Sequence, residues 1–174
     1  MNDQATAPAT GGSPPAAGKQ TLPAVEGWFT LDGDGPALLA TRCRACGTYY
    51  FPAQRMLCRH TSCSSRELDD VELSRTGTIW SFTDNRYQPP PPYMSAEPFE
   101  PFGIAAVELA AEKLVVLGQL AAGTDVSALH AGDEVELVVE VLYSDDDADY
   151  TVWRWRPTGA GGGANASNTT QESN

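Results

Sequence analysis

The stretch Cys43-Arg44-Ala45-Cys46, followed by Cys58-Arg59-His60-Thr61-Ser62-Cys63, decides the fold of this chain. It holds all four cysteines of the protein, in two close pairs within one short window. A short loop between two cysteines places both sulfurs on one metal ion, and a second loop completes a tetrahedral four-thiolate site. The spacing therefore predicts a zinc site with Cys43, Cys46, Cys58 and Cys63 as ligands. Because four protein ligands leave no open coordination position, we expect the zinc to be structural and not catalytic.

Two alternatives to this site stay open at the level of sequence. His60 lies inside the second loop and can replace one cysteine, although four thiols already fill a tetrahedral set. Four thiolates can also hold iron as a redox centre, which metal analysis would distinguish from zinc. The second loop, Cys58-x4-Cys63, is longer than the common two-residue spacing but remains within the range of ligand loops.

Positive charge is concentrated around the predicted metal site. Between Arg42 and Arg66 the chain has five arginines and no acidic residue, and they are Arg42, Arg44, Arg55, Arg59 and Arg66. One interpretation is that they donate to the thiolates and to solvent. The other is that they contact an acidic partner or a phosphate-bearing ligand, because guanidinium groups bind phosphates through paired donors.

The bulk composition limits the organisation and the partners of the chain. Residues 1–20 and 159–174 are poor in large apolar side chains, so both are expected to be disordered tails. About 135 residues remain, enough for one modest core and a small metal module. The formal net charge of −12 argues against nucleic acid or an anionic membrane as the partner of the whole molecule.

The N-terminus lacks the apolar run of an export signal, and no stretch approaches the roughly 18–20 apolar residues of a membrane span. We therefore expect a cytoplasmic protein with no membrane partner. A reducing cytoplasm favours metal binding over disulfide formation, which agrees with the predicted zinc site.

The segment before the cysteines is predicted to lead into the metal module. Residues 21–36 form a short helix or loop in this prediction, with Val25–Leu31 packed on a neighbour and Trp28 and Phe29 as either core residues or an exposed anchor. Residues 37–41 are predicted to be a strand, and residues 48–51 its returning partner. The predicted metal module spans residues 37–70.

From residue 71 to residue 158 the pattern indicates a β domain. In the strand at 76–82, alternation predicts Ile79 and Ser81 on one face and Trp80 and Phe82 on the other, with a bulge or bend at Gly77. A proline-rich loop follows. A hairpin is predicted to turn at Ala110–Lys113, and strands are predicted at residues 133–143 and 150–157. About five strands in this length fit a small closed barrel, which leaves no exposed sheet edge.

These features together resemble a known family, in which a rubredoxin-like zinc ribbon precedes an acyl-CoA-associated OB-fold. The resemblance covers Leu22 to Pro157, and its most specific part is Leu39-Ala40-Thr41-Arg42-Cys43-x-x-Cys46-Gly47-x-x-Tyr50-Phe51-Pro52. Supporting stretches are Thr76-Gly77-Thr78-Ile79-Trp80-Ser81-Phe82-Thr83, Pro89-Pro90-Pro91-Pro92-Tyr93 and Phe102-Gly103-Ile104-Ala105-Ala106-Val107-Glu108-Leu109. The long second cysteine loop and the turn at 110–113 depart mildly from the family pattern.

The resemblance implies a mainly β protein that is a non-catalytic subunit of a thiolase-like enzyme. The partner would act on acyl-CoA thioesters, as an acyltransferase or as an aldolase that removes steroid side chains, in a heteromer such as a heterotetramer. Candidate contacts to acyl-CoA or to the partner are Arg42, Arg44, Arg55, Arg59, Tyr87, Pro91, Tyr93, Phe99 and Phe102.

The residues themselves agree with a non-catalytic role, because zinc would occupy every cysteine and only two histidines exist. The alternative function is a single-stranded nucleic-acid module, since zinc ribbons and OB-folds also bind single strands. In that reading Trp80, Phe82, Trp153 and Trp155 would stack bases.

Overall fold

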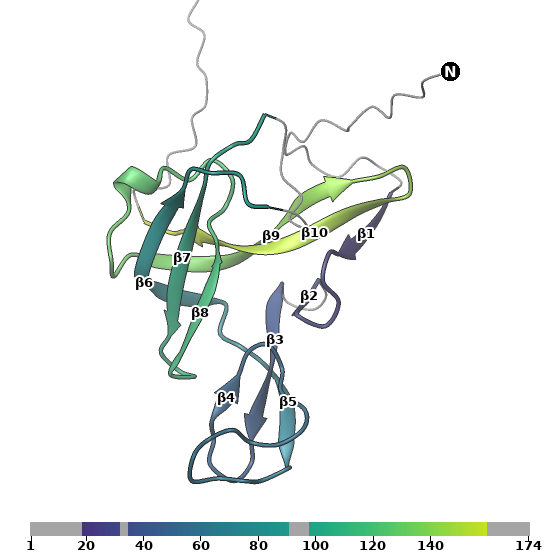
Figure 1. The fold of residues 1–174 in the computed structure, drawn as a ribbon, viewed down its shortest axis with the longest axis vertical. Helices are drawn as coiled ribbons and strands as arrows, with labels where there is room; N and C mark the ends of the chain where they lie inside the picture. Colours follow the sequence, from purple (N-terminus) through teal and green to yellow (C-terminus); the bar gives the residue numbers. More distant parts are fainter. Residues whose placement is uncertain (1–18, 32–34, 91–97, 160–174) are drawn as a thin grey trace, which may run out of the picture.

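The computed structural model describes residues 19–31, 35–90 and 98–159. Figure 1 shows a barrel built from strands, with a small ribbon of strands below it. Within the described residues the only helix is a single 3-10 turn, Val126–Ala128, so the predicted mainly β class is confirmed. None of the helical structure described is long and apolar enough to cross a membrane. The expected tails lie outside the described residues except for Lys19, Gln20 and Gly159, and Gln20 already belongs to the first strand.

The ribbon is organised around its central strand β3 (Ala37–Cys43). The strand β2 (Phe29–Thr30) pairs with the first half of β3, and β4 (Tyr49–Tyr50) and β5 (Leu68–Glu72) pair with its second half. All three pairings are antiparallel. The predicted strand at 37–41 and the returning strand at 48–51 are therefore both present, and β3 ends at the first cysteine.

The barrel contains the five strands predicted after the ribbon. They are β6 (Thr76–Asn85), β7 (Phe102–Leu109), β8 (Leu114–Gln119), β9 (Glu134–Ser144) and β10 (Ala148–Pro157). Their order in the sheet is β10-β9-β6-β7-β8. A parallel bridge between Leu120 and Trp155 brings the two ends of this sheet together, and the Ala121 N–H donates to the Trp155 carbonyl at 2.8 Å. The sheet thus curls into the OB-type barrel, with a short bridge as its closure.

The lead-in segment differs from the prediction, because the helix alternative for Val25–Leu31 is wrong. The chain forms β1 (Gln20–Pro23), then a turn, then β2. β1 pairs in parallel with β10 and extends the barrel sheet to six strands. Of the aromatic pair, Phe29 is a core residue, while Trp28 stays partly exposed. The conformation of this segment is set by its pairing with strands that are distant in the sequence, and local composition does not predict such pairing.

The strand β6 departs from the predicted alternation. Its register with β7 shifts between Ile79 and Ser81, so β6 holds one extra residue at that point. Ile79 is therefore buried and Phe82 packs on the same core, while Trp80 and Ser81 face solvent. The predicted assignment of these side chains to the two faces of the strand was wrong, because a bulge shifts the two-residue alternation by one residue. The alternation pattern in the sequence does not indicate where such a shift occurs. The bulge lies at Trp80 and not at Gly77.

The ribbon and the barrel share one hydrophobic core. Phe29, Leu38 and Ala40 from the ribbon belong to the same buried cluster as the barrel residues around Trp155. Aromatic rings connect the parts in an edge-to-face series, with centroid distances of 5.9 Å from Trp28 to Phe51 and 6.0 Å from Phe51 to Trp153. Such pairs contribute about 0.5–1.5 kcal/mol each beyond their buried area. The ribbon is therefore packed onto the barrel and is not a module on a tether.

A hydrogen-bonded carboxylate fixes the joint between the two parts. Glu112, in the turn between β7 and β8, accepts hydrogen bonds at 2.9 Å from both the backbone N–H and the hydroxyl of Ser74. Ser74 lies between β5 of the ribbon and β6 of the barrel. Hydrogen bonds to a charged group are stronger than neutral ones, at about 1.5–3 kcal/mol. The carboxylate therefore holds the chain at the point where it leaves the ribbon.

The fold predicts the effect of adding one methyl group at Gly118 of β8. A Cβ atom there would overlap the indole ring of Trp153 and lie 3.0 Å from Trp155 Cδ1. Gly118→Ala should therefore lower the free energy of unfolding by about 1–3 kcal/mol, the usual cost of overpacking. Urea denaturation measures it. Val115→Ala on the exposed face of the same strand is the matched control, expected within about 0.5 kcal/mol. Equal stability of the Gly118 variant and the unsubstituted protein would contradict the packing described.

Candidate metal centre

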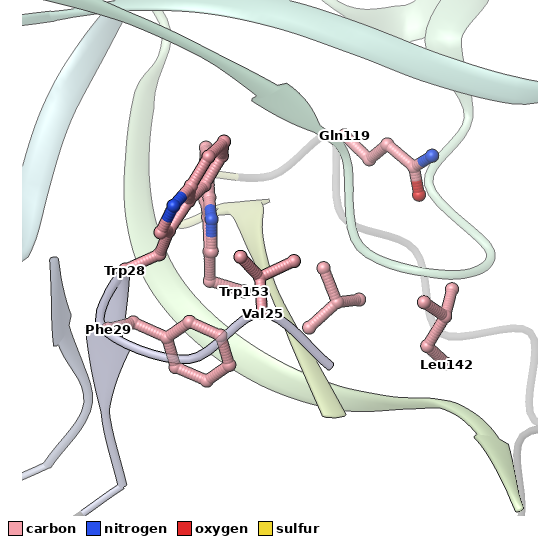
Figure 2. Close-up of a pocket in the computed structure, with 7 residues that line it drawn as sticks. Val25, Trp28, Phe29, Gln119, Leu142 and Trp153 are labelled. Atoms are coloured by element: carbon pink, nitrogen blue, oxygen red, sulfur yellow. The ribbon is translucent and has the colours of Figure 1, made fainter. Parts of the chain in front are cut away.

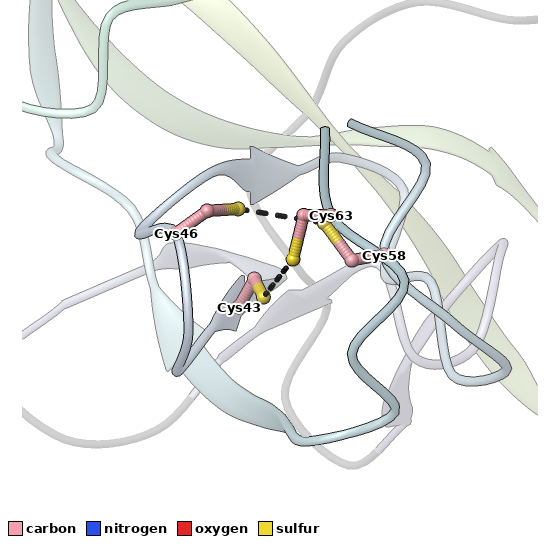
Figure 3. A group of neighbouring side chains, drawn as sticks. All are labelled: Cys43, Cys46, Cys58 and Cys63. Carbon is pink, nitrogen blue, oxygen red and sulfur yellow. Dashed lines mark hydrogen bonds between the residues drawn. The ribbon is translucent and has the colours of Figure 1, made fainter. Parts of the chain in front are cut away.

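The four cysteine thiols converge at the end of β3, as Figure 3 shows. All four Sγ atoms lie within 4.8 Å of one another. The Cys43–Cys63 and Cys46–Cys58 sulfur pairs are separated by 3.9 Å and 3.5 Å. A zinc ion with four Zn–S bonds of about 2.3 Å requires sulfur separations of about 3.8 Å. The geometry therefore fits the predicted zinc ion.

Backbone hydrogen bonds shape the two ligand loops. In the first loop the Gly47 N–H donates to the Cys43 carbonyl at 2.9 Å, and Gly47 adopts a φ of 76°, which an L side chain disfavours. In the second, the Cys58 N–H donates to the Ser65 carbonyl at 2.8 Å. His60 is exposed, and its Nδ1 accepts from the Ser62 N–H at 3.4 Å. The ligand group found among the described residues contains the four cysteines and not His60.

Local dipoles favour thiolate at some of these sulfurs. The hydroxyl and then the N–H of Thr48 lower the pKa of Cys46 to about 6, and the N–H of Cys46 is the largest influence that lowers the pKa of Cys43. At Cys63 the Ser65 N–H also favours thiolate, but burial and the neighbouring thiols prevail and raise its pKa to about 11. Neighbouring negative charges thus oppose full ionisation, and a divalent cation at the centre would relieve that repulsion.

A tyrosine supports the second ligand pair from outside the cluster. The Tyr50 hydroxyl lies 3.1 Å from Cys58 Sγ and accepts from the Arg59 N–H at 2.9 Å. With its oxygen accepting that bond, the hydroxyl hydrogen is free to point at the sulfur. The contact with Cys58 is the largest cause of the raised pKa of Tyr50. Such outer contacts orient metal ligands, so β4, which carries Tyr50, helps to form the site.

The structure neutralises part of the arginine cluster. Arg44 Nη2 lies 2.7 Å from Asp69 Oδ1, and Arg55 Nη1 lies 2.7 Å from Asp70 Oδ1. The Arg44 hydrogen bond lowers the pKa of Asp69, and that carboxylate raises the pKa of Arg44. Both aspartates come from β5, just beyond the acid-free window of the sequence. Pairing of β5 with β3 brings these aspartates close to the arginines. The spacing of the residues along the chain does not predict this contact.

The other three arginines make no close ion pair within the described residues, although Arg42 is near enough to Asp69 to help lower the pKa of that carboxylate after Arg44. The Arg42 guanidinium carbon lies 5.5 Å from the centroid of the Tyr49 ring, within cation–π range. In the amide orientation that satisfies both groups, the Gln54 side-chain oxygen accepts from Arg59 Nε at 3.1 Å. Arg42 and Arg44 line a shallow polar depression of about 300 Å³ beside Cys43. The ribbon surface thus keeps positive charge, mainly at Arg42, Arg59 and Arg66.

The predicted contact residues after β6 lie far from the ribbon. Tyr87 is exposed, and Phe99 packs edge to face on Phe102 with 6.2 Å between ring centroids. Pro91 and Tyr93 lie outside the described residues. The chain leaves the ribbon at the start of β6, whereas this loop begins at the other end of the strand, at the opposite end of the molecule in Figure 1. The structure therefore does not bring the two predicted contact surfaces together.

The residues suggested for base stacking do not form a stacking platform. Trp155 is fully buried and Trp153 is only 8% exposed, while Phe82 packs against the core. Trp80 remains exposed. Stacking of successive bases requires exposed aromatic faces along one groove. The structure thus lacks the arrangement on which the nucleic-acid interpretation depended.

The structure contains an apolar groove that the sequence did not predict. Figure 2 shows it between the lead-in turn and the barrel, with a volume of about 220 Å³ and mostly apolar lining residues, namely Val25, Trp28, Phe29, Gln119, Leu142, Val152 and Trp153. The one feature of the sequence that pointed to this groove was Trp28, with a predicted role as either a core residue or an exposed anchor. Val25 lies in the same turn, and the remaining lining residues come from the four strands β2, β8, β9 and β10. The register shift between Tyr150 and Thr151 of β10 hides their proximity in the sequence.

The metal centre predicts a specific response to ligand replacement. Cys43→Ser or Cys58→Ser removes a thiolate from the closed site, so the variants should lose their equivalent of bound zinc and unfold the ribbon, because structural zinc binding supplies folding free energy. Zinc per chain from elemental analysis, together with circular dichroism, measures both effects. His60→Ser is the matched control from the same loop and should retain one zinc. A Cys43→Ser variant with one zinc and unchanged melting would contradict the assignment.

Comparisons with known proteins agree with this architecture. Residues 34–69 match the ChsH2 rubredoxin-like zinc ribbon domain, and residues 70–140 match the ChsH2 C-terminal OB-fold domain. The benzoylsuccinyl-CoA thiolase subunit BbsA of Thauera aromatica is 32% identical over 116 residues, which cover 67% of this chain and 72% of that protein. Its namesake from Geobacter metallireducens is 32% identical over 117 residues, covering 67% of this chain and 70% of that protein.

Among solved structures, a chain of the Ltp2–ChsH2(DUF35) aldolase superposes with a TM-score of 0.52 and 29% sequence identity. The match covers 70% of this chain and 84% of that chain. Two adjacent domain matches, two sequence relatives and one structural relative thus point to the same group of proteins. The chain belongs to the ChsH2 family, in which a rubredoxin-like zinc ribbon is followed by an OB-fold domain.

Proposed function

We propose that this chain is a non-catalytic accessory subunit of a thiolase-like enzyme that acts on acyl-CoA thioesters. The observation that carries the proposal is the convergence of all four cysteines on one closed metal site, which leaves no thiol as a nucleophile. The histidines offer no substitute, because His60 and His130 are both exposed and lie in loops. Its relatives carry the names of a thiolase subunit and of an aldolase, which supports the role of a subunit.

The reaction of the partner is proposed to be cleavage of a carbon–carbon bond β to the thioester. We favour a retro-aldol cleavage of a steroid side-chain CoA ester, within a heterotetramer. The support is the resemblance of the sequence from Tyr93 to Leu109 and from Val115 to Gln119 to that branch, together with the likeness to the Ltp2–ChsH2(DUF35) aldolase. A thiolase reaction is the second candidate, supported by the 32% identity to two benzoylsuccinyl-CoA thiolase subunits.

The division of labour predicts that neither protein is sufficient alone. This chain and the thiolase-like protein encoded nearest to it in the source genome should form a complex on co-expression, and only the complex should turn over at the full rate. Size-exclusion chromatography tests the complex, and release of the cleavage product from candidate acyl-CoA esters tests turnover. Full turnover by either protein alone would exclude the proposed role.

We further propose that unpaired ribbon arginines contact the phosphates of CoA. Arg42 and Arg59 are the candidates, because Arg44 and Arg55 already bind the carboxylates of Asp69 and Asp70. The loop residues Tyr87, Phe99 and Phe102 remain candidates for contact with the partner. These two groups of candidates belong to different parts of the chain, the ribbon and the segment from the end of β6 to the start of β7.

The phosphate contact predicts a change in KM. In the assembled enzyme, replacing Arg42 and Arg59 together by alanine should raise KM for acyl-CoA by at least about tenfold with little change in kcat, because each ionic hydrogen bond contributes about 1.5–3 kcal/mol. Arg44→Ala is the control, with an expected change below twofold, since that side chain is paired. Steady-state kinetics decide, and an unchanged KM in the double variant would exclude these arginines as CoA contacts.

A further inference from the structure

The outer surface of the barrel differs between its two halves. On β9 and β10 it carries opposite charges that pair across the strands. Arg156 Nη2 lies 2.8 Å from Glu136 Oε1, and Arg154 Nη1 lies 3.3 Å from Glu140 Oε2. The Arg156–Glu136 pair is exposed, with 55% and 42% of the two side chains accessible, whereas the Arg154–Glu140 pair is mostly covered, with 14% and 27% accessible. Charged cross-strand pairs suit a sheet face in contact with water. The part of this half around Arg156 and Glu136 therefore has a solvated surface.

The outer face of β6, β7 and β8 instead gathers three exposed apolar side chains, beside the exposed polar residues Ser81, Thr83 and Glu108. Trp80 is 66% exposed, Leu117 is 68% exposed and Val115 is 47% exposed. The register places these positions side by side, because Ala106 of β7 pairs with Ser81 on one side and with Leu117 on the other. Ile104 lies two residues from Ala106 on the same face of β7. We call Trp80, Ile104, Ala106, Val115 and Leu117 the Trp80 face.

The bulge in β6 creates this face. Without the extra residue, Trp80 and Phe82 would lie on the same side of the strand. With it, Ile79 and Phe82 both pack inward and Trp80 faces outward. Bulges of this kind re-aim a single side chain while the strand continues. Because the bulge directs the Trp80 indole outward, this side chain does not contribute to the core, and we look for its role at the surface.

The composition of the Trp80 face is that of a protein interface. Tryptophan is enriched at the residues that contribute most to binding, and charged residues are depleted at interface centres. Glu108 borders the face, where it pairs with Val115. Large exposed apolar side chains gathered on one face of a sheet are typical of an interaction site.

We propose that the Trp80 face binds the thiolase-like partner subunit, an inference that rests on the proposed function. Two observations select this occupant. Relatives of the chain are named as a thiolase subunit and as part of an aldolase, so a surface for a different chain is required. A second copy of this chain is disfavoured, because each copy carries a formal net charge of −12 and two like-charged bodies repel at close range.

The test measures binding of the intact chain to the thiolase-like protein encoded nearest to it. Trp80→Ser and Leu117→Ser should each weaken the affinity, the former by at least about thirtyfold, which corresponds to the loss of a central anchor. Met56→Ser is the matched control, because Met56 is 73% exposed but lies on the ribbon. It should bind within about twofold of the unsubstituted chain. Isothermal titration calorimetry gives the affinities, and thermal melting verifies that each exposed-site variant is folded.

The outcomes separate this inference from the proposed function. If the unsubstituted chain binds no thiolase-like protein, the proposed function fails and the inference fails with it. If the complex forms and both Trp80→Ser and Leu117→Ser bind as tightly as the unsubstituted chain, the inference alone is overturned. Equal weakening by Met56→Ser overturns it as well. Self-association that is abolished by Trp80→Ser would show that a second copy occupies the face, which also overturns the proposal.

Discussion

Packing of Phe51 against Trp153 is the contact on which the rest of the architecture depends. Phe51 follows β4, whose Tyr50 touches the metal ligand Cys58, and Trp153 lies in the barrel above Gly118. This aromatic contact thus joins the barrel core to a residue, Phe51, that directly follows the tyrosine beside the metal ligand Cys58. Because buried residues of both parts form one cluster, the ribbon completes the core of the barrel. The β1 strand strengthens this union by pairing with β10.

Local chemistry made much of this structure predictable. The cysteine spacing identified the metal site, and two-residue alternation identified most strands, including the predicted strand at residues 150–157 that forms most of β10. Turn residues located the hairpin between β7 and β8. Each of these signals lies within a few residues, where spacing alone fixes the geometry.

Pairings between distant segments were not predictable from one sequence. Asp69 and Asp70 lie outside the acid-free window but return to Arg44 and Arg55 through strand pairing. The lead-in segment looked locally like a helix or loop, yet a strand and a turn form because β10 and β3 offer unpaired edges. The bulge at Trp80 changed the direction of one side chain against an otherwise regular pattern. In each case tertiary contacts prevailed over local preference.

The common core gives the zinc ion an influence beyond its ligands. A ligand that binds only the folded state raises the free energy of unfolding. Above the dissociation constant, each tenfold increase in free ligand concentration adds about 1.4 kcal/mol. Where the ribbon folds alone, this gain stays local. Here Leu38 and Ala40 lie in the same core as Trp155, so the gain extends to the barrel and to every surface that the barrel presents. The abundance of folded subunit is thereby linked to the zinc supply of the cell.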